Sequence, residues 1–318
     1  MRFEEMKRRI RELPGVAGWP QMQALVERPI PRETSVWEYP VAACRAVGGP
    51  EAAALPASAA IFCSVISIHL VDDMLDEDPR GDHHFLGTGP VSNLALAFQA
   101  AGHQLLDQAT LSPEIRAALQ AVFSEMSLST AHGQSLDQRS LRSEEEYWQV
   151  VGAKTPPLFA AAFTIGSLLG GAPAEIVERL GRIGVLLGLG VQVSDDLLDA
   201  LSTPAASDWS RRPNNLPILY AMTADHPERE SFLELSARVA EPDALAAAQG
   251  ILVRSGALSY CAFKLHEFLG EARDHLASVP LSSPEPVLRL LDAQTAPLQR
   301  LFAASGAPET DSLFPHRA

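Results

Sequence analysis

Two apolar segments, each followed at once by a group of aspartates, constrain the fold of this chain most strongly. The first segment, IFCSVISIHLV, leads into VDDMLDED, and the second, IGVLLGLGVQV, leads into SDDLLDA. Neither segment has a polar face to turn toward water, so each is predicted to be a helix in the middle of a helical bundle. Prolines bracket both helices: Pro56 and Pro79 the first, Pro173 and Pro204 the second.

The rest of the chain also has helical periodicity. Ala and Leu are frequent, only 4 residues are Tyr, and runs that alternate β-branched and polar residues are missing. Further helices are predicted at 36–47, 91–109, 112–137, 144–154, 158–169, 215–223, 229–239, 243–277 and 284–304. The chain is therefore predicted to be all-α, with one domain over residues 1–318 and a loose polar tail at 305–318.

Composition argues against several classes of partner. The chain has 25 Lys and Arg against 39 Asp and Glu, a net charge of −14, which disfavours binding to nucleic acid or to anionic lipid. The apolar stretch at 52–71 contains Pro56 and has no basic flank, so a core helix is predicted in place of a membrane span. No apolar signal segment opens the sequence, and the cysteines are few and scattered, which predicts reduced thiols and a cytoplasmic protein.

The two acidic groups share the pattern DDxLD. Their first and last carboxylates are four residues apart, so they stack on one helix face about 6 Å apart along the axis. Such like charges repel, and burial at the end of an apolar helix adds a further cost. Mg²⁺ would offset this charge, because it combines a few carboxylates with water and phosphate oxygens. Two groups facing each other would form a cage for a diphosphate. The candidate metal ligands are Asp72, Asp73, Asp76, Asp195, Asp196 and Asp199.

With these motifs, residues 35–275 resemble the trans-isoprenyl diphosphate synthases, also called the polyprenyl synthetase family. Both DDxLD groups match the Asp-rich motifs of that family. Four smaller matches follow in the family's order: Gly133-Gln134, Lys154-Thr155, Gln192 and Asn215-Leu216-Pro217. The resemblance implies the all-α isoprenoid-synthase bundle with a central active cavity, and it implies a homodimer.

The resemblance also implies an enzyme that ionises an allylic prenyl diphosphate with the help of three Mg²⁺ ions. By this comparison Asp72 and Asp76 would hold two of the ions and Asp195 the third. Lys154 would contact the leaving diphosphate, while Thr155 and Gln192 would stabilise the carbocation with their oxygen dipoles. Further candidate contacts to the diphosphate come from cations near the motifs: Arg80, Arg211 and Arg212.

The prenyl pocket is predicted to lie beneath the first acidic group. In the family, a bulky residue four or five positions before this group closes the pocket, whereas this chain has Ile68 and Ser67 there and Ser64 one turn earlier. None is aromatic, so by this resemblance no fifteen-carbon limit is imposed there and a chain of twenty carbons or more could fit; the allylic substrate is predicted to have fifteen carbons or more. Gln134 is assigned to the same pocket. The two serines have an alternative role as core residues bonded to carbonyls of the preceding turn.

The chain departs from the family where isopentenyl diphosphate would bind. The segment aligned with the family's basic GKRxRP motif runs from Ser35 to Pro40 and contains no cation, and Val65 replaces a histidine on the first acidic helix. Each lost charged hydrogen bond would weaken diphosphate binding by about 1.5–3 kcal/mol. The sequence therefore predicts ionisation followed by cyclisation, proton loss, capture by water or transfer to another acceptor, as in a class I terpene synthase or a non-standard prenyltransferase.

Two alternatives remain open at this stage. The first is an ordinary chain-elongating synthase of the geranylgeranyl type, in which Arg32, Arg45 and His69 supply the missing cations. The second is a non-catalytic subunit of a heteromeric prenyl synthase, although both acidic motifs are complete.

Overall fold

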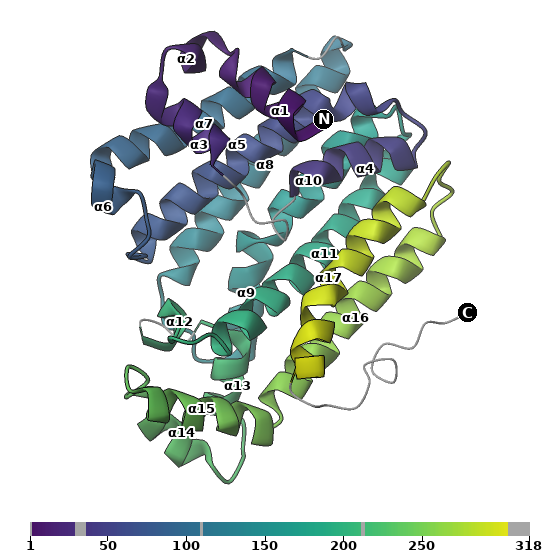
Figure 1. Ribbon diagram of the computed structural model, residues 1–318. Helices are drawn as coiled ribbons and strands as arrows, with labels where there is room; N and C mark the ends of the chain where they lie inside the picture. The colour runs from purple at the N-terminus through teal and green to yellow at the C-terminus, as the bar shows by residue number, and fades with distance from the viewer. Residues whose placement is uncertain (1, 29–35, 109–110, 211–213, 305–318) are drawn as a thin grey trace. The chain divides into compact units, whose positions relative to one another are not determined.

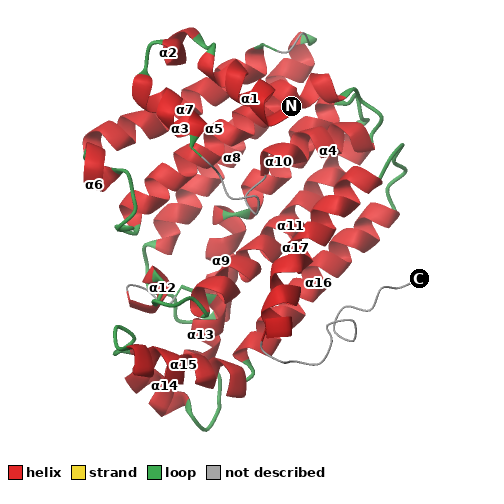
Figure 2. Ribbon diagram, in the orientation of Figure 1, coloured by secondary structure: helices red, strands yellow, loops and turns green. Residues whose placement is uncertain are grey.

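Every regular element in the described part of the chain is a helix (Figure 1; Figure 2). The structure is a computed structural model that describes residues 2–28, 36–108, 111–210 and 214–304. The predicted all-α class is confirmed. Contacts divide the chain into two compact units, each built from separate stretches of sequence. The prediction of one domain stays a prediction, and its tail at 305–318 lies outside the described residues.

Unit 1 comprises Met1–Ala131, Pro157–Val185 and His275–Val287. Its helical elements are α1 (Arg2–Arg11), α2 (Pro14–Ala17), α3 (Pro20–Glu27), η2 (Val36–Glu38), α4 (Tyr39–Ala46), α5 (Glu51–Leu75), α6 (His83–Leu86), α7 (Thr88–Asp107), most of α8 (Pro113–Asp137), α10 (Pro156–Leu169) and the start of α11 (Ala174–Ala200).

The central helix of unit 1 is α5, the first of the two apolar helices. It packs most extensively against α7 and then against α4, α1 and η2, and Ile61, Phe62 and Cys63 are fully buried. The helix begins before Pro56, not after it as predicted. A proline inside a helix costs about 3 kcal/mol, so the burial of the apolar residues around it is what keeps the helix continuous.

Unit 2 comprises His132–Pro156, Leu186–Asp274 and Leu288–Ala318. It contains the end of α8, α9 (Glu144–Lys154), the second half of α11, α12 (Ser207–Ser210), α13 (Leu216–Thr223), α14 (Arg229–Ser236), α15 (Pro242–Arg254), most of α16 (Ala257–Ala277) and most of α17 (Glu285–Ala304). One cluster in its core surrounds Trp209 and Phe232, with Ile218, Leu245 and Ile251 buried beside them.

The predicted helix at 243–277 is wrong, because the structure has α15 and α16 in its place. The two helices are separated at Gly256, whose φ of 84° lies in the left-handed region that glycine adopts without strain. The apolar periodicity continues across this break, so periodicity alone gives one helix. The helices α1, α2 and α3 were not predicted either.

One described helix, α5, is long and apolar enough to cross a membrane by length and composition alone. Most of its apolar window, 78%, is buried inside the structure. Burial of this kind is what a core helix of a bundle shows, which agrees with the predicted core position.

A close backbone approach in unit 1 gives a first prediction. A Cβ atom at Gly166 in α10 would lie 2.2 Å from the carbonyl oxygen of Pro40 in α4, and a backbone atom cannot move aside cheaply. We expect Gly166→Ala to lower the free energy of unfolding by about 1–3 kcal/mol, as measured by chemical denaturation. The control is Gly270→Ala in α16, where nothing lies within 4 Å. Equal stability changes in the two variants would contradict the packing described here.

Candidate active site

The residues of the predicted site in unit 2 come together at the end of α9 and on α11. Helix α9 begins where the Ser143 side chain accepts a hydrogen bond from the Glu146 amide, a standard N-cap. It ends at Lys154, and Thr155 is its C-cap. This helix therefore carries the predicted Lys-Thr pair on its last turn.

Thr155, Gln192 and Asp196 form a continuous chain of hydrogen bonds. The Thr155 hydroxyl donates to Gln192 Oε1 with an O···O distance of 2.5 Å, and Gln192 Nε2 donates to Asp196 Oδ1 at 2.8 Å. Gln192 and Asp196 are four residues apart on α11, so they share one face of that helix. The structure thus brings Thr155 and Gln192, the two predicted carbocation-stabilising residues, into direct contact.

Asp196 is the most completely bonded acid of its group. Its Oδ2 accepts hydrogen bonds from the Tyr147 hydroxyl and from the Leu216 amide, each at 2.7 Å, in addition to the bond from Gln192. Its side chain is 3% exposed. Burial raises the pKa of Asp196 to about 7, against the opposing effect of these hydrogen bonds. Three donors on a buried carboxylate favour a positioning role for Asp196, and its role as a metal ligand stays a prediction.

Asp195 and Asp199 have different surroundings. Both side chains are exposed, and the Asp195 carboxylate makes no hydrogen bond or ion pair with a side chain in the described part of the chain. Partial desolvation, with a further contribution from the Asp199 carboxylate, raises the pKa of Asp195 to about 7. An accessible carboxylate whose charge is uncompensated is a suitable oxygen ligand for Mg²⁺. The Asp195 carboxylate therefore fits Mg²⁺ as a ligand.

Lys154 is held by an acid that the sequence did not single out. Its Nζ lies 2.7 Å from Asp137 Oδ2, and Asp137 Oδ1 accepts a hydrogen bond of 2.9 Å from Asn214 Nδ2. Both partners of the pair are about one-fifth exposed. The Lys154 ammonium group is thus fixed in position, while part of the side chain remains open to solvent.

Gly133, the glycine of the predicted Gly-Gln pair, explains how α8 approaches α9. A Cβ atom at this position would lie 2.4 Å from Lys154 N and 2.5 Å from Lys154 Cα. Only glycine permits this separation, so Gly133 sets the position of the Lys154 backbone. The neighbouring Gln134 is 4% exposed, and neither end of its amide has a hydrogen-bond partner among the described residues.

The first acidic group lies at the end of α5 in unit 1. Asp72 and Asp73 are in the last turn and Asp76 is the C-cap residue, and all three are half-buried. Desolvation, reinforced by the Asp78 carboxylate, raises the pKa of Asp73. No group of three or more His, Cys, Asp or Glu side chains among the described residues is arranged as a metal site by itself. Mg²⁺ at either acidic group would therefore take further ligands from water and phosphate.

The predicted pocket residues on α5 have mixed environments. Ser67 is buried and donates a hydrogen bond of 2.9 Å to the Ala95 carbonyl of α7. This partner is on another helix, not in the preceding turn. Ser64 is fully buried, and its hydroxyl has no partner among the described residues, while Ile68 is partly exposed.

The three predicted arginine contacts are only partly described. The Arg80 guanidinium is paired with Asp78, with an N···O distance of 2.7 Å, and its side chain is 89% exposed. Arg211 and Arg212 lie outside the described residues. Their predicted contact to a diphosphate stays a prediction.

Sequence reasoning missed the supporting residues Asp137, Tyr147 and Asn214. Asp137 lies one turn after Gly133-Gln134, and Asn214 precedes the Asn-Leu-Pro motif, so both adjoin motifs that were found. Tyr147 has no such signal, because its partner Asp196 is far away in the sequence. Contacts of that kind become visible only in the folded chain.

Comparison with known proteins gives consistent matches. The family model described as polyprenyl synthetase matches residues 41–251. A curated geranylfarnesyl diphosphate synthase from Aeropyrum pernix is 28% identical over 261 residues, which cover 76% of this chain and 81% of that protein. The solved structure of geranylgeranyl pyrophosphate synthetase from Pyrococcus horikoshii superposes with a TM-score of 0.80 at 20% identity, covering 94% of this chain and 95% of that one.

A further solved structure is that of polyprenyl synthase from Caulobacter crescentus complexed with calcium and isoprenyl diphosphate. It has a TM-score of 0.79 at 23% identity, and the match covers 94% of this chain and 95% of that one. At these identities the solved structures support the fold, which is the all-α isoprenoid-synthase fold predicted from the sequence.

The pKa of Asp195 leads to a second prediction. A carboxyl group whose pKa is raised in the folded state binds more protons folded than unfolded, so its contribution to stability falls as pH rises from about 4 to 7. We expect Asp195→Asn to remove this loss of stability, and so to raise the Tm at pH 8 in the absence of metal by roughly 1–3 °C. The shift is small because solvent screens the exposed group. The difference should shrink toward pH 4. Asp225→Asn, at an exposed carboxylate after α13, is the control. A lower Tm for Asp195→Asn at pH 8 would contradict this account.

The contact at Gly133 leads to a third prediction. Gly133→Ala should push the last turn of α9 away from α8, lower the free energy of unfolding by about 1–3 kcal/mol and weaken binding of inorganic pyrophosphate, because Lys154 is displaced. Gly152→Ala is the matched control on α9, since nothing lies within 4 Å of its Cβ position, and it should be neutral or stabilise by up to about 1 kcal/mol. Calorimetric titration and denaturation measure both effects. Unchanged pyrophosphate affinity in Gly133→Ala would refute the positioning role.

Proposed function

This chain belongs to the polyprenyl synthetase family, and we propose that it is a Mg²⁺-dependent prenyl diphosphate synthase that extends an allylic prenyl diphosphate with isopentenyl diphosphate. The observation that carries the ionisation step is the Thr155–Gln192–Asp196 chain beside an accessible Asp195. The elongation step is supported by the relatives named as prenyl diphosphate synthases. The comparisons thus favour the chain-elongating alternative over the terpene-synthase function that the sequence placed first.

The chain's own residues would act mainly by stabilising the charges that form when the prenyl diphosphate ionises. The bond between C1 of the prenyl group and the diphosphate oxygen breaks, and the electron pair leaves with the diphosphate. Mg²⁺ held by the aspartates would neutralise the growing negative charge. Lys154, fixed by Asp137, would add a positive charge beside the leaving group. Thr155 would present its oxygen lone pairs to the allylic cation, and Gln192, whose amide oxygen accepts the Thr155 hydroxyl, would orient them.

Elongation then requires an acceptor at C1 of the cation. The double bond of isopentenyl diphosphate would attack C1, a new carbon–carbon bond would form, and a proton would leave the isopentenyl unit for the released diphosphate. The small residues Ser64 and Ser67 on α5 support a long product, because no aromatic side chain occupies the positions before the first acidic group. We propose a product of twenty carbons or more.

A second candidate function is supported by the residues at the family's basic positions. Val36 is 7% exposed, and Tyr39 is 2% exposed with its ring 5.5 Å from Phe159. The Trp37 ring lies 5.2 Å from the Phe3 ring and 5.5 Å from the Phe62 ring. These side chains form part of the core of unit 1, so none of them can bind a diphosphate.

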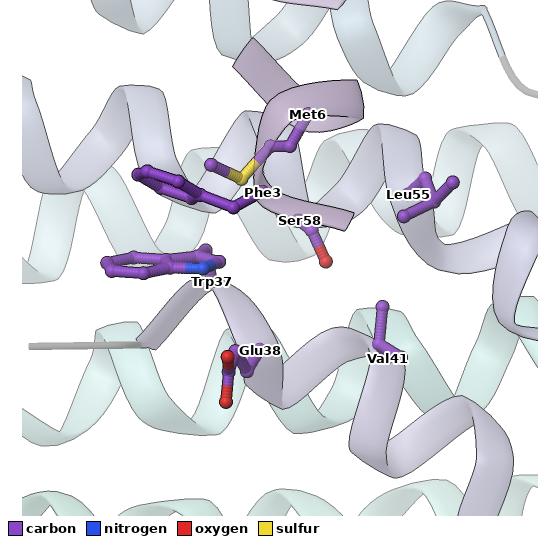
Figure 3. A pocket seen from close by; sticks show the side chains of 7 residues that line it. All are labelled: Phe3, Met6, Trp37, Glu38, Val41, Leu55 and Ser58. Atoms are coloured by element: carbon purple, nitrogen blue, oxygen red, sulfur yellow. The ribbon is translucent and has the colours of Figure 1, made fainter. Parts of the chain in front are cut away.

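A pocket at the same place is largely apolar. Figure 3 shows the Phe3 and Trp37 rings facing each other on one side of it, with Leu55 on the other. Its remaining lining residues are Met6, Glu38, Val41 and Ser58. The Glu38 carboxylate would repel a diphosphate. The apolar side chains at the family's basic positions support the second candidate, in which the cation is cyclised, deprotonated, captured by water or passed to an uncharged acceptor.

The cations of the chain-elongating alternative were predicted to be Arg32, Arg45 and His69. Arg45 lies 4.0 Å from the Glu51 carboxylate. His69 is exposed on α5, and Arg32 lies outside the described residues. A second diphosphate site built from Arg45 would therefore have to displace an existing ion pair. We also propose a homodimer, three Mg²⁺ ions at the site and a cytoplasmic location.

A product assay separates the two candidates and is the fourth prediction. The protein is incubated with Mg²⁺ and with geranyl, farnesyl or geranylgeranyl diphosphate, each with and without isopentenyl diphosphate, and extracts are compared before and after phosphatase treatment. We expect longer diphosphates only when isopentenyl diphosphate is present. A hydrocarbon or alcohol formed without isopentenyl diphosphate and without phosphatase would contradict elongation and support the second candidate. Chelation by EDTA should abolish either activity, and no consumption in any mixture would refute both.

A further inference from the structure

A closed set of hydrogen bonds fastens α9 to α11 at two points. Near the start of α9, the Tyr147 hydroxyl donates to Asp196; at its end, Thr155 donates to Gln192, which in turn donates to Asp196. Tyr147 is 0% exposed, and its hydroxyl lies 2.7 Å from Asp196 Oδ2. A phenol is protonated at neutral pH, so it donates this hydrogen bond.

These bonds fix which way the Gln192 amide points. The Asp196 carboxylate accepts hydrogen bonds from the Tyr147 hydroxyl and the Leu216 amide, and the amide nitrogen of Gln192 faces it as a third donor. The amide oxygen is then directed at Thr155. The reverse orientation would place two oxygens against each other at 2.8 Å, the distance measured between Gln192 Nε2 and Asp196 Oδ1.

The orientation of Gln192 determines the orientation of the Thr155 hydroxyl. Its hydrogen is taken by Gln192 Oε1, so the lone pairs of Thr155 Oγ1 are directed away from Gln192. Every group in the chain from Asp196 to Thr155 has its dipole aligned in the same sense, and aligned hydrogen bonds polarise one another. The result is a Thr155 oxygen with more negative charge than an isolated hydroxyl would have.

We propose that Tyr147 is a positioning residue for the ionisation step: it holds Asp196 so that Gln192 turns the lone pairs of Thr155 toward the allylic cation. This inference rests on the proposed function only in its first half, the formation of an allylic cation. It does not depend on whether the cation then meets isopentenyl diphosphate or another acceptor. Tyr147 itself acts through Asp196, Gln192 and Thr155.

The test is a double-mutant cycle on kcat, which is the fifth prediction. Tyr147→Phe removes one hydroxyl and should lower kcat for consumption of the allylic diphosphate about tenfold; Thr155→Val should lower it about 100-fold. If Tyr147 acts through Thr155, the double variant should be no slower than Thr155→Val alone. In a Thr155→Ser background, which keeps the hydroxyl, the tenfold effect of Tyr147→Phe should persist. If Tyr147→Phe does not fold, Tyr147→Met, which also lacks the hydroxyl and adapts to an irregular core space, replaces it in the same cycle.

Two measurements separate positioning from a purely structural role. The Kd of inorganic pyrophosphate with Mg²⁺ should change less than twofold in Tyr147→Phe. Tyr260→Phe is the matched control: Tyr260 on α16 also donates its hydroxyl to α9, to Glu144 at the start of the helix, but has no contact with the chain that ends at Thr155. Its kcat should equal that of the wild type.

Each outcome decides the proposal. Full kcat in Tyr147→Phe, multiplicative losses in the double variant, or a parallel loss of pyrophosphate affinity would overturn the positioning role while leaving the proposed function intact. If the wild-type protein binds pyrophosphate with Mg²⁺ but consumes no allylic diphosphate, the proposed function fails, and this inference fails with it. A tenfold loss that disappears in the Thr155→Val background supports both.

Discussion

The organisation of unit 2 depends on one buried carboxylate, Asp196. Removing a carboxylate from water is costly, and the cost is tolerable only when its oxygens are hydrogen-bonded. The three donors come from α9, from α11 and from the first residue of α13, where the positive end of the helix dipole also favours a negative charge. The same bonds that offset burial therefore fix the relative positions of these elements. Thr155, Gln192 and the Asn-Leu-Pro turn are in place because Asp196 is satisfied.

The two acids beside each other on α11 show how environment separates roles. Asp195 and Asp196 belong to the same motif, yet one is exposed and without a described partner while the other is buried and fully bonded. A carboxylate that binds a metal ion needs free lone pairs. A carboxylate that holds neighbouring helices in place has its lone pairs occupied by hydrogen bonds. The motif alone cannot distinguish them, because the distinction arises from Tyr147 and Leu216, which lie elsewhere in the sequence.

The features that could be predicted from the sequence are those with local signals or repeated motifs. Helix α9 was predicted with its observed bounds, since its N-cap and the Lys-Thr pair both have sequence signals, and the Thr155 and Gln192 positions followed from motifs. What failed or was missed depends on tertiary contact. Burial carries α5 through Pro56, one backbone angle at Gly256 interrupts an otherwise periodic stretch, and the Tyr147–Asp196 bond joins distant residues. The same holds at 36–39, where the sequence showed that cations are missing and the structure shows aromatic packing in their place.

The acidity of this chain has a consequence for how an anionic substrate arrives. A protein of net charge −14, with exposed carboxylates such as Asp195 and Asp199 beside its candidate site, repels a free diphosphate before any contact is made. Phosphate-binding proteins usually attract their ligand, and added salt weakens that attraction. Here added salt would instead weaken a repulsion. Divalent cations bound to the carboxylates, or to the diphosphate itself, would reverse the sign of the local field. Under the proposed function, the metal would then set the rate at which the substrate is captured as well as the rate of the chemistry.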